Sequence, residues 1–295
     1  MTAPIAVLGV GGIGGMIAAR TGALVVGTAR TVEAVAASGL TLVHREGTLV
    51  VHPEAAERLE RPVSLLVIAV KAYDLDEALE RIEPESVASA ILLPLLNGLE
   101  HVDALRVRLP GVAVAAGTIG QVEAYSAEPA LVVQRTPGAR IAAASRDVEA
   151  GRLSAALEPL RVPGIEVAVE EDEGAVLWEK AARLAVLAAA TVASGATVGV
   201  LRADPEWRVR LETALAEACA VAAADRSTVD TAGQWAIIEA LPGDLITSTA
   251  RDLAAGRPTE LDAITGSVVR VGRRLGVPTP ALGELLAEAR SKERA

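Results

Sequence analysis

Hydrophobic residues in the first 170 positions fall into short apolar runs separated by helix-like stretches. Seven runs are predicted as strands: Ile5–Leu8, Leu24–Gly27, Leu65–Val70, Ile91–Leu95, Val112–Ala116, Ile141–Ala143 and Ile165–Val169. Apolar runs of this kind suit a parallel sheet covered on both faces, and their alternation with helices indicates βαβ units. Leu40–His44 and Thr48–His52 are predicted to pair as a hairpin around Arg45-Glu46-Gly47. We therefore expect a doubly wound α/β fold.

The pattern changes after the acidic run Glu170–Glu173, beyond which only helices are predicted. Asp204-Pro205-Glu206 is typical of a helix start, because Asp caps, Pro fits the first turn and Glu lies at the positive dipole end. Thr259 and Asp262 resemble a capping box, and Gly276-Val277-Pro278 is expected to end that helix. Two domains follow, 1–170 and an all-helical 171–295.

One stretch of the helical half, Leu184–Leu201, carries no charge and approaches the length of a membrane span. It is rich in Ala, Gly, Thr and Ser and lacks a flanking basic cluster, which disfavours insertion. We expect a buried central helix of a soluble domain. A helix without a polar face must be covered by other helices or by a dimer contact, so a homodimer is left open.

Composition narrows the function. The 295 residues include 51% apolar ones, enough for a sizeable core, and the net charge of −10 disfavours nucleic acid and anionic membranes as partners. One cysteine, Cys219, and three histidines provide neither a disulfide framework nor a zinc site. The chain runs from Met1 directly into a predicted strand without a leader-like segment, so we expect a cytoplasmic protein.

A glycine-rich loop follows the first predicted strand and opens a helix. In IAVLGVGGIGG, Gly9 permits a tight turn, Gly11 lets the backbone approach a pyrophosphate, and Gly14 allows close packing of helix on strand. The intervening Gly12 and Ile13 belong to the helix N-terminus that would face the anion. In this context the loop predicts a dinucleotide-binding site.

The end of the second strand indicates which dinucleotide binds. An acidic residue there would hydrogen-bond the ribose 2′-hydroxyl of NAD, but this chain has Arg30 followed by Thr31. A guanidinium beside a hydroxyl suits the 2′-phosphate of NADP. We therefore expect NADP(H), the alternative being that Arg30 is an ordinary exposed arginine.

Other polar residues are ambiguous when taken singly. Lys71 and Asn97 follow consecutive predicted strands and should lie at the ligand-binding edge of the sheet, although they also read as a loop lysine and a turn. Lys180 precedes the uncharged stretch, where apolar surroundings would make it a competent proton donor, but a surface lysine is the simpler interpretation. Ser248 and Glu260, near the C-terminal helices, carry no assignment from the residues alone.

Taken together, these motifs resemble the ketopantoate reductase family over nearly the whole chain. The resemblance is carried by IAVLGVGGIGG, Arg30, Val70-Lys71-Ala72-Tyr73, Asn97-Gly98, Trp178-Glu179-Lys180, Thr247–Asp252, Gly256–Asp262 with Gly266, and Gly276–Pro280. It implies an NADP-binding Rossmann domain, 1–170, and a helical substrate or dimerisation domain, 171–295, of 6-phosphogluconate-dehydrogenase type. It also implies NADPH-dependent reduction of a 2-oxo acid, in the family 2-dehydropantoate to pantoate on the route to coenzyme A.

The resemblance assigns a role to each candidate residue. Lys180 would be the general acid that protonates the carbonyl oxygen as hydride arrives, and Glu260 would hold the substrate hydroxyl and orient the lysine. Ser248 would bind the carboxylate end of the substrate. Asn97 would bridge the nicotinamide ribose and the substrate, and Lys71 would lie against the cofactor. An ammonium beside a developing alkoxide stabilises charge that exists mainly in the transition state.

The chain departs from the family pattern where substrate-binding asparagines are usual. Leu184 and Ala188 occupy two such positions, Ala196-Thr197-Val198 covers a third, and Thr249 replaces a methionine. Apolar groups cannot replace the lost hydrogen bonds. A less polar 2-oxo acid and a non-catalytic NADP(H)-binding sensor are therefore alternatives. A β-hydroxyacid dehydrogenase is disfavoured, because its glycine-rich substrate motif is missing from the second half.

Overall fold

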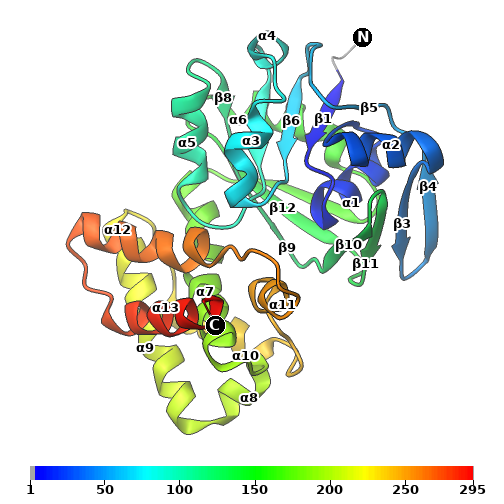
Figure 1. Ribbon diagram of the computed structural model, residues 1–295. Helices are drawn as coiled ribbons and strands as arrows, with labels where there is room; N and C mark the ends of the chain where they lie inside the picture. The colour runs from blue at the N-terminus through cyan, green and yellow to red at the C-terminus, as the bar shows by residue number, and fades with distance from the viewer. Residues whose placement is uncertain (1–3, 295) are drawn as a thin grey trace. The chain divides into compact units, whose positions relative to one another are not determined.

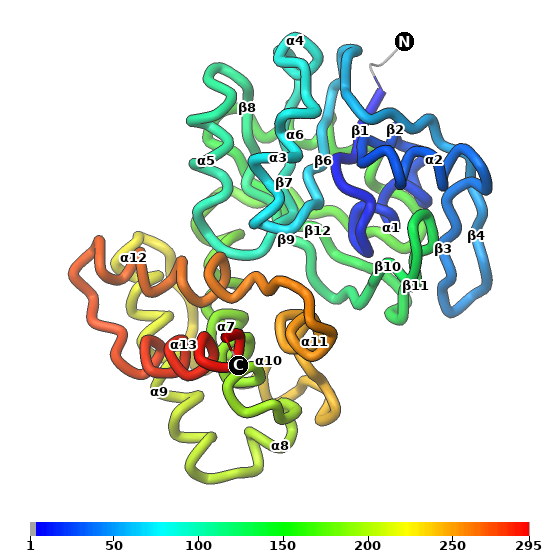
Figure 2. Tube along the Cα trace, in the orientation of Figure 1, coloured from blue at the N-terminus to red at the C-terminus, as the bar shows by residue number. Residues whose placement is uncertain are grey.

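The computed structural model describes residues 4–294, which divide into two compact units. The first unit runs to Leu96 and resumes at His101–Val176, while the second comprises Asn97–Glu100 and begins again at Leu177. Figures 1 and 2 show strands in the blue-to-green first unit and helices in the second. The predicted boundary at residue 170 falls just before α7 (Glu173–Ser194); as a division of function it stays a prediction.

A six-stranded parallel sheet forms the centre of the first unit, in the order β5-β2-β1-β6-β7-β8. Its strands are β1 (Ile5–Leu8), β2 (Leu24–Val26), β5 (Ala55–Ala56), β6 (Leu65–Ile68), β7 (Ile91–Pro94) and β8 (Ala113–Val114). Every residue of β1, β2, β6 and β7 is buried, as expected for apolar strands covered on both faces. The doubly wound α/β prediction is confirmed.

Two smaller sheets complete this unit and were only partly predicted. A four-stranded sheet has the order β10-β11-β3-β4, and a three-stranded sheet has the order β13-β12-β9. Their strands are β3 (Leu40–His44), β4 (Gly47–Val51), β9 (Ala116–Gly120), β10 (Ala124–Glu128), β11 (Leu131–Gln134), β12 (Ala139–Ala144) and β13 (Ile165–Val169). The predicted hairpin is β3 and β4. The expectation that the later strands continue the parallel sheet was wrong, since β12 pairs antiparallel with β9.

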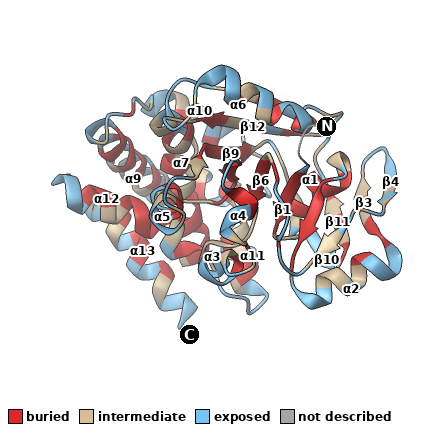
Figure 3. Ribbon diagram, turned by 90° about the horizontal axis from the view of Figure 1, so that it is seen from above, coloured by how far each residue is buried: buried red, intermediate tan, exposed pale blue. Residues whose placement is uncertain are grey.

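Helices flank these sheets in the βαβ manner. They are α1 (Gly12–Thr21), α2 (Ala29–Ser38), α3 (Leu75–Leu79), α4 (Pro84–Val87), α5 (His101–Arg108) and α6 (Ala150–Leu157), with short 3₁₀ turns at Ala72–Asp74 and Glu158–Leu160. The buried face of α1, from Gly14 to Ala19, packs into one hydrophobic core with β1, β3 and β12. Figure 3 shows this core in red.

The second unit is helical throughout its described residues. Its helices are α7, α8 (Val198–Ala203), α9 (Pro205–Ala224), α10 (Thr231–Ala240), α11 (Ser248–Ala254), the π-helical turn η3 (Asp262–Gly266), α12 (Ser267–Leu275) and α13 (Pro280–Glu293). Their core is built from small aliphatic side chains around Trp178, whose Nε1 donates to Asp225 Oδ2 at 2.9 Å. In the part of the chain that the structure describes, no helix combines the length and apolar character that crossing a membrane requires.

The uncharged stretch is not one helix, contrary to expectation. α7 ends at Ser194, Gly195 adopts a left-handed φ of 68°, and Thr197 caps the separate α8 by accepting a hydrogen bond from Val200 N. A short hydroxyl-bearing residue after glycine is typical of such a break and restart. Most residues between Leu184 and Val192 are nevertheless buried, as predicted.

The predicted helix ends are mostly confirmed. Asp204 caps α9 through the amides of Glu206 and Trp207, and Gly276 ends α12 with a φ of 73°. The capping box was partly wrong. The Thr259 hydroxyl accepts from Leu261 N at 3.2 Å, but the Asp262 carboxylate pairs with arginines instead of returning to the helix start.

Candidate functional site

The glycine loop adopts the conformation that its spacing predicts. Gly9 has a φ of 91°, in the region that favours glycine, and a side chain there would meet Val70 at 2.5 Å. A Cβ on Gly14 would lie 1.9 Å from the carbonyl oxygen of Gly9. Glycine at both positions therefore lets α1 begin directly against the end of β1.

Gly11 differs from its neighbours, since a Cβ on it would meet no protein atom within 4 Å. Gly11 is exposed at the head of α1, where the first-turn amides lack intrahelical acceptors. Gly12 is closed off instead, because its Cβ would meet the main chain of Ala124 at 2.3 Å. The open space beside Gly11 and the free amide end of α1 fit a pyrophosphate.

Arg30 lies where the sequence predicts it, just beyond β2. It is exposed in the first turn of α2, behind the capping residue Thr28, whose hydroxyl lies 3.2 Å from that of Thr31. An exposed guanidinium at this sheet edge is available to a 2′-phosphate.

Lys71 follows β6 and is partly buried at the start of a 3₁₀ turn, where its carbonyl accepts from Asp74 N at 2.9 Å. β6 and β7 are parallel neighbours, so Lys71 and Asn97 both follow carboxyl ends of adjacent strands. Asn97, however, packs with the helical unit.

Lys180 is the most strongly perturbed candidate. It is partly buried on α7, and burial lowers its pKa from 10.5 to about 8 because the charged form loses solvation. The Glu260 carboxylate opposes this shift and raises the pKa, while Arg183 lowers it. Lys180 is thus an ammonium at neutral pH that gives up its proton readily.

Glu260 and Asn97 lie together beside this lysine in the second unit. Glu260 is only 4% exposed, and its Oε2 accepts a hydrogen bond from Asn97 Nδ2 at 3.4 Å. The two residues are 163 positions apart. The nearby Glu260 carboxylate offsets part of the cost of holding the Lys180 ammonium away from water.

The segment Asn97–Glu100, here called the strap, is fixed to the helical unit at two points. Gly98 has a φ of 96°, and a Cβ on it would lie 2.1 Å from the carbonyl oxygen of Ala263. The Glu100 carboxylate accepts from Arg270 at 2.6 to 3.2 Å, and Arg270 also holds both carboxylate oxygens of Asp262 at 3.0 and 3.1 Å. These contacts hold Asn97 beside Glu260.

Ser248 is the first residue of α11 and is partly buried. Its neighbour Thr247 caps α11, and the Thr247 hydroxyl lies 2.7 Å from that of Thr191 on α7. This buried hydroxyl pair fixes the start of α11, and with it Ser248, to the helix that carries Lys180.

Two of the positions that depart from the family pattern lie along α7 beyond Lys180, and Thr249 lies on α11. Leu184 is partly buried and Ala188 fully buried, one and two turns further on. Thr249 is 1% exposed, and its hydroxyl has no hydrogen-bond partner among the described residues. Leu184 and Ala188 therefore make the stripe of α7 beyond Lys180 apolar.

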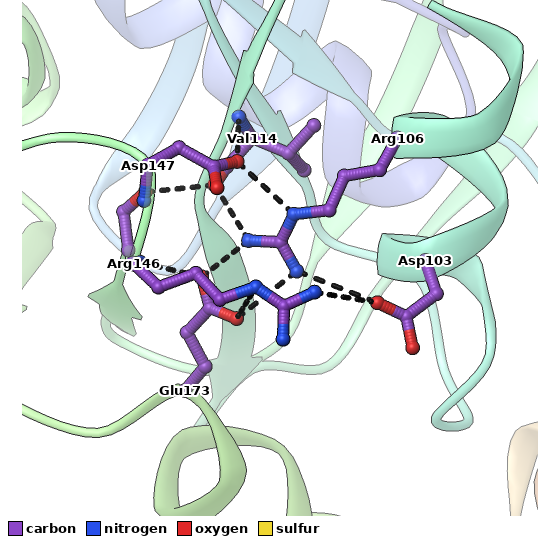
Figure 4. A network of polar contacts seen from close by, with 7 residues as sticks. Asp103, Arg106, Val114, Arg146, Asp147 and Glu173 are labelled. Carbon is purple, nitrogen blue, oxygen red and sulfur yellow. Dashed lines mark hydrogen bonds and ion pairs between the residues drawn. The ribbon is translucent and has the colours of Figure 1, made fainter. Parts of the chain in front are cut away.

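A separate ionic network lies in the first unit and fixes the start of α7 (Figure 4). Arg106 on α5 donates to Glu173 at 2.5 and 3.1 Å and to Asp147 at 3.0 Å, while Asp147 also accepts from Val114 N. These groups satisfy one another, so the network serves structure.

Sequence reasoning missed Arg183 and Arg270. The only sequence signal for Arg183 is its place immediately before the uncharged stretch Leu184–Leu201. Arg270 carries none, because its partners Glu100 and Asp262 are distant in sequence. In residues 4–294, no group of three or more His, Cys, Asp and Glu side chains is placed to hold a metal ion.

Comparison with known proteins now supplies the family. The family model described as ketopantoate reductase PanE/ApbA matches residues 5–146, and the model of its C-terminal part matches 174–293. The 2-dehydropantoate 2-reductase of Vibrio cholerae is 30% identical over 248 residues, which cover 78% of each chain.

Solved structures agree with this assignment. A PanE/ApbA family ketopantoate reductase from Ralstonia eutropha is 28% identical, has a TM-score of 0.86 and covers 98% of both chains. A D-mandelate dehydrogenase, solved with NADH and anilino(oxo)acetate, has a TM-score of 0.87 at 21% identity, a likeness that concerns the fold. The predicted family is confirmed: the chain belongs to the ketopantoate reductase family of NAD(P)-dependent oxidoreductases that act on CH–OH groups.

Proposed function

We propose that the protein reduces 2-dehydropantoate to pantoate with NADPH and that Lys180 is the general acid. The observation that carries the proposal is the group formed by the buried Glu260 with the partly buried Lys180 and Asn97. A lysine whose pKa is lowered to about 8 remains largely protonated at pH 7, yet transfers its proton easily.

In this proposal some residues of the second unit transfer the proton and others orient the substrate. The Lys180 ammonium donates a hydrogen bond to the carbonyl oxygen and then its proton as negative charge develops there. Glu260 keeps the lysine charged and accepts a hydrogen bond from a substrate hydroxyl, while Ser248 donates to the carboxylate end. Asn97, held by Glu260, keeps one amide face for substrate and cofactor ribose.

The first unit provides the cofactor site in this proposal. A bound NADPH supplies the hydride that reduces the carbonyl carbon. The amides of Gly11, Gly12 and Ile13 bind the pyrophosphate, supported by the open space beside Gly11. Arg30 pairs with the 2′-phosphate, and Lys71 adds positive charge at the same sheet edge.

A second candidate substrate is a 2-oxo acid with an apolar side chain. Leu184 and Ala188 offer no hydrogen bond to a distal hydroxyl such as that of 2-dehydropantoate. With no hydrogen bond from these two positions, the desolvation of the hydroxyl is compensated only through Glu260, which favours a substrate without that hydroxyl. The same Lys180 chemistry would then act on a less polar acid.

The deciding experiment measures NADPH oxidation by purified protein with 2-dehydropantoate and with a panel of branched aliphatic 2-oxo acids. Turnover of 2-dehydropantoate at the highest kcat/KM supports the proposal, and preference for a panel member supports the second candidate. NADPH binding without turnover of any acid contradicts both and favours a non-catalytic NADP(H)-binding sensor.

A further inference from the structure

Arg183 is a partly buried cation one turn from Lys180 on α7. Residues three apart on a helix are neighbours, so both side chains lie on the same flank. Nη1 of Arg183 donates to Gln234 Oε1 on α10 and, at 3.3 Å, to the main-chain carbonyl of Glu179. Gln234 is only 4% exposed, so this contact lies inside the protein.

The charge of Arg183 has no counter-ion in direct contact. Within the described residues, no carboxylate oxygen lies within 4.0 Å of its guanidinium, and both acceptors are neutral. Burial lowers the pKa of Arg183, opposed through space by Glu179, and the nearby Lys180 adds a second positive charge. Charges taken away from water are normally paired in proteins, so an anion that reaches this guanidinium would be stabilised there.

Arg202 on α8 shows how this chain compensates another partly buried arginine within the protein. Its Nη1 donates to the carbonyls of Ile238, Glu239 and Leu241 at the end of α10, where the helix dipole is negative. Arg183 has no such terminus. Its Nε and Nη2 make no hydrogen bond with described residues, and these two nitrogens form the edge that binds a carboxylate bidentately.

We propose that Arg183 binds the carboxylate of the 2-oxo acid substrate through Nε and Nη2. Ser248 supplies only a neutral hydroxyl to that group, whereas Arg183 supplies the balancing charge. The role deepens the proposed function and rests on it. Arg183 thereby selects 2-oxo acids over neutral ketones and aldehydes, because an uncharged substrate would leave the Arg183 guanidinium without an anion in direct contact.

The test uses two unreactive probes with the same skeleton, oxamate, which has a carboxylate, and oxamide, which is neutral. Calorimetry with the NADPH-loaded protein should show oxamate binding at least tenfold more tightly than oxamide. Arg183→Met should weaken oxamate binding at least tenfold and leave oxamide binding unchanged. Arg202→Met is the matched control and should retain the wild-type preference.

Arg183→Lys keeps the positive charge but not the planar guanidinium that binds a carboxylate with two nitrogens. Its affinity for oxamate should therefore lie between those of wild type and Arg183→Met. If Arg183→Met does not fold, Arg183→Lys takes its place in the comparison of oxamate with oxamide. Equal binding of the probes by wild type, including no detectable binding, overturns the inference, as does full oxamate affinity in a folded Arg183→Met. A variant that only raises the pKa seen in the kcat profile, with oxamate affinity intact, assigns Arg183 to tuning Lys180 and also overturns it.

Turnover separates this inference from the proposed function. Reduction of a 2-oxo acid without charge selection leaves the proposed function standing and removes the role of Arg183. Charge selection between the probes without any turnover leaves the role of Arg183 standing and removes the catalytic proposal.

Discussion

The glycine loop of the first unit and the Lys180 group of the second are built in opposite ways. The loop is contiguous, Gly9 to Gly14, and acts through main-chain amides and the absence of side chains. The Lys180 group joins three distant segments through side chains, with Asn97 and Glu260 separated by 163 positions. A main-chain site is specified locally, whereas a side-chain site exists only after the helices have packed.

This contrast predicts that the two sites fail separately. Changing a side chain of the Lys180 group should abolish reduction of the 2-oxo acid and leave dinucleotide binding intact, because the glycine loop depends on none of those side chains. Changing the loop should remove dinucleotide binding and leave the helical core intact, because that core is a separate hydrophobic cluster.

The largest effect is expected from Lys180→Met. Loss of a general acid typically costs 10²–10⁴ in rate, so we expect kcat to fall about a thousandfold. The dissociation constant of NADPH, measured by fluorescence titration, should change less than twofold. An NADPH affinity that falls in parallel with kcat would contradict the separation of the two sites.

The pH dependence of the wild type provides the control for that variant. Only the ammonium form of Lys180 can donate a proton, so kcat should be level below pH 8 and fall about tenfold per pH unit above it. The free energy of unfolding should rise with pH over the range in which kcat falls. The folded pKa of about 8 lies below the ordinary 10.5, so stability rises between those pH values as the folded protein loses the proton, and Lys180→Met should abolish that rise.

The glycine loop provides a matched pair of variants. Gly14→Ala places a methyl group 1.9 Å from the Gly9 carbonyl oxygen, so we expect the loop to shift and NADPH affinity to fall at least a hundredfold. Gly11→Ala meets no protein atom within 4 Å, so its melting temperature should match wild type. It should nevertheless lose about tenfold in NADPH affinity, because the methyl group occupies the space proposed for the pyrophosphate.

Unchanged NADPH affinity in Gly11→Ala would move the pyrophosphate away from this position. A large loss of thermal stability in the same variant would show instead that Gly11 serves the fold. Acetate or another small anion cannot replace NADPH in this titration, because the prediction concerns binding of the whole dinucleotide.

Much of the fold could be predicted from the sequence, because apolar runs identify strands buried on both faces. β1 and β13 were predicted at their observed bounds and β2, β6, β7 and β8 within two residues at each end, whereas the short β5 was not predicted. β10 was missed because Ala124–Glu128 is mostly exposed and has no alternating pattern. β9 and β11 were not predicted either. The break of α7 at Gly195 was missed because an uncharged stretch gives no periodicity to interrupt.

The candidate site could be predicted only in part. The glycine loop and Arg30 follow from local spacing and strand ends. Lys180 and Glu260 came from the family resemblance, since their mutual electrostatic effect depends on the packing of α7 against the turn before η3. No local pattern could have shown that the strap packs with the helical unit or that, among residues 4–294, no carboxylate contacts the Arg183 guanidinium directly.

A smaller effect is expected at Arg30, which tests how the first unit distinguishes NADPH from NADH. Arg30 is exposed and makes its proposed contact with the 2′-phosphate in solvent, so Arg30→Ala should weaken NADPH binding about tenfold. Binding of NADH, which lacks that phosphate, should be unchanged, and titration of both cofactors checks the ratio. An equal loss for both would assign Arg30 to the fold of α2.

The smallest effect is expected at the strap, where the side-chain site depends on a partly exposed ionic cluster. Arg270→Met removes the link between Glu100 and Asp262, but the close approach of Gly98 to Ala263 remains. Partly exposed pairs contribute about 1 kcal/mol or less, so Asn97 should loosen rather than dissociate from Glu260. We expect KM for the 2-oxo acid to rise about fivefold while kcat changes less than twofold, and Glu100→Gln should reproduce the change. A fall in kcat as large as that of Lys180→Met would contradict this expectation. It would show that the strap positions Lys180 and Glu260 as well as Asn97. The rate of the side-chain site would then depend on distant contacts more strongly than the small energy of an exposed ionic cluster implies.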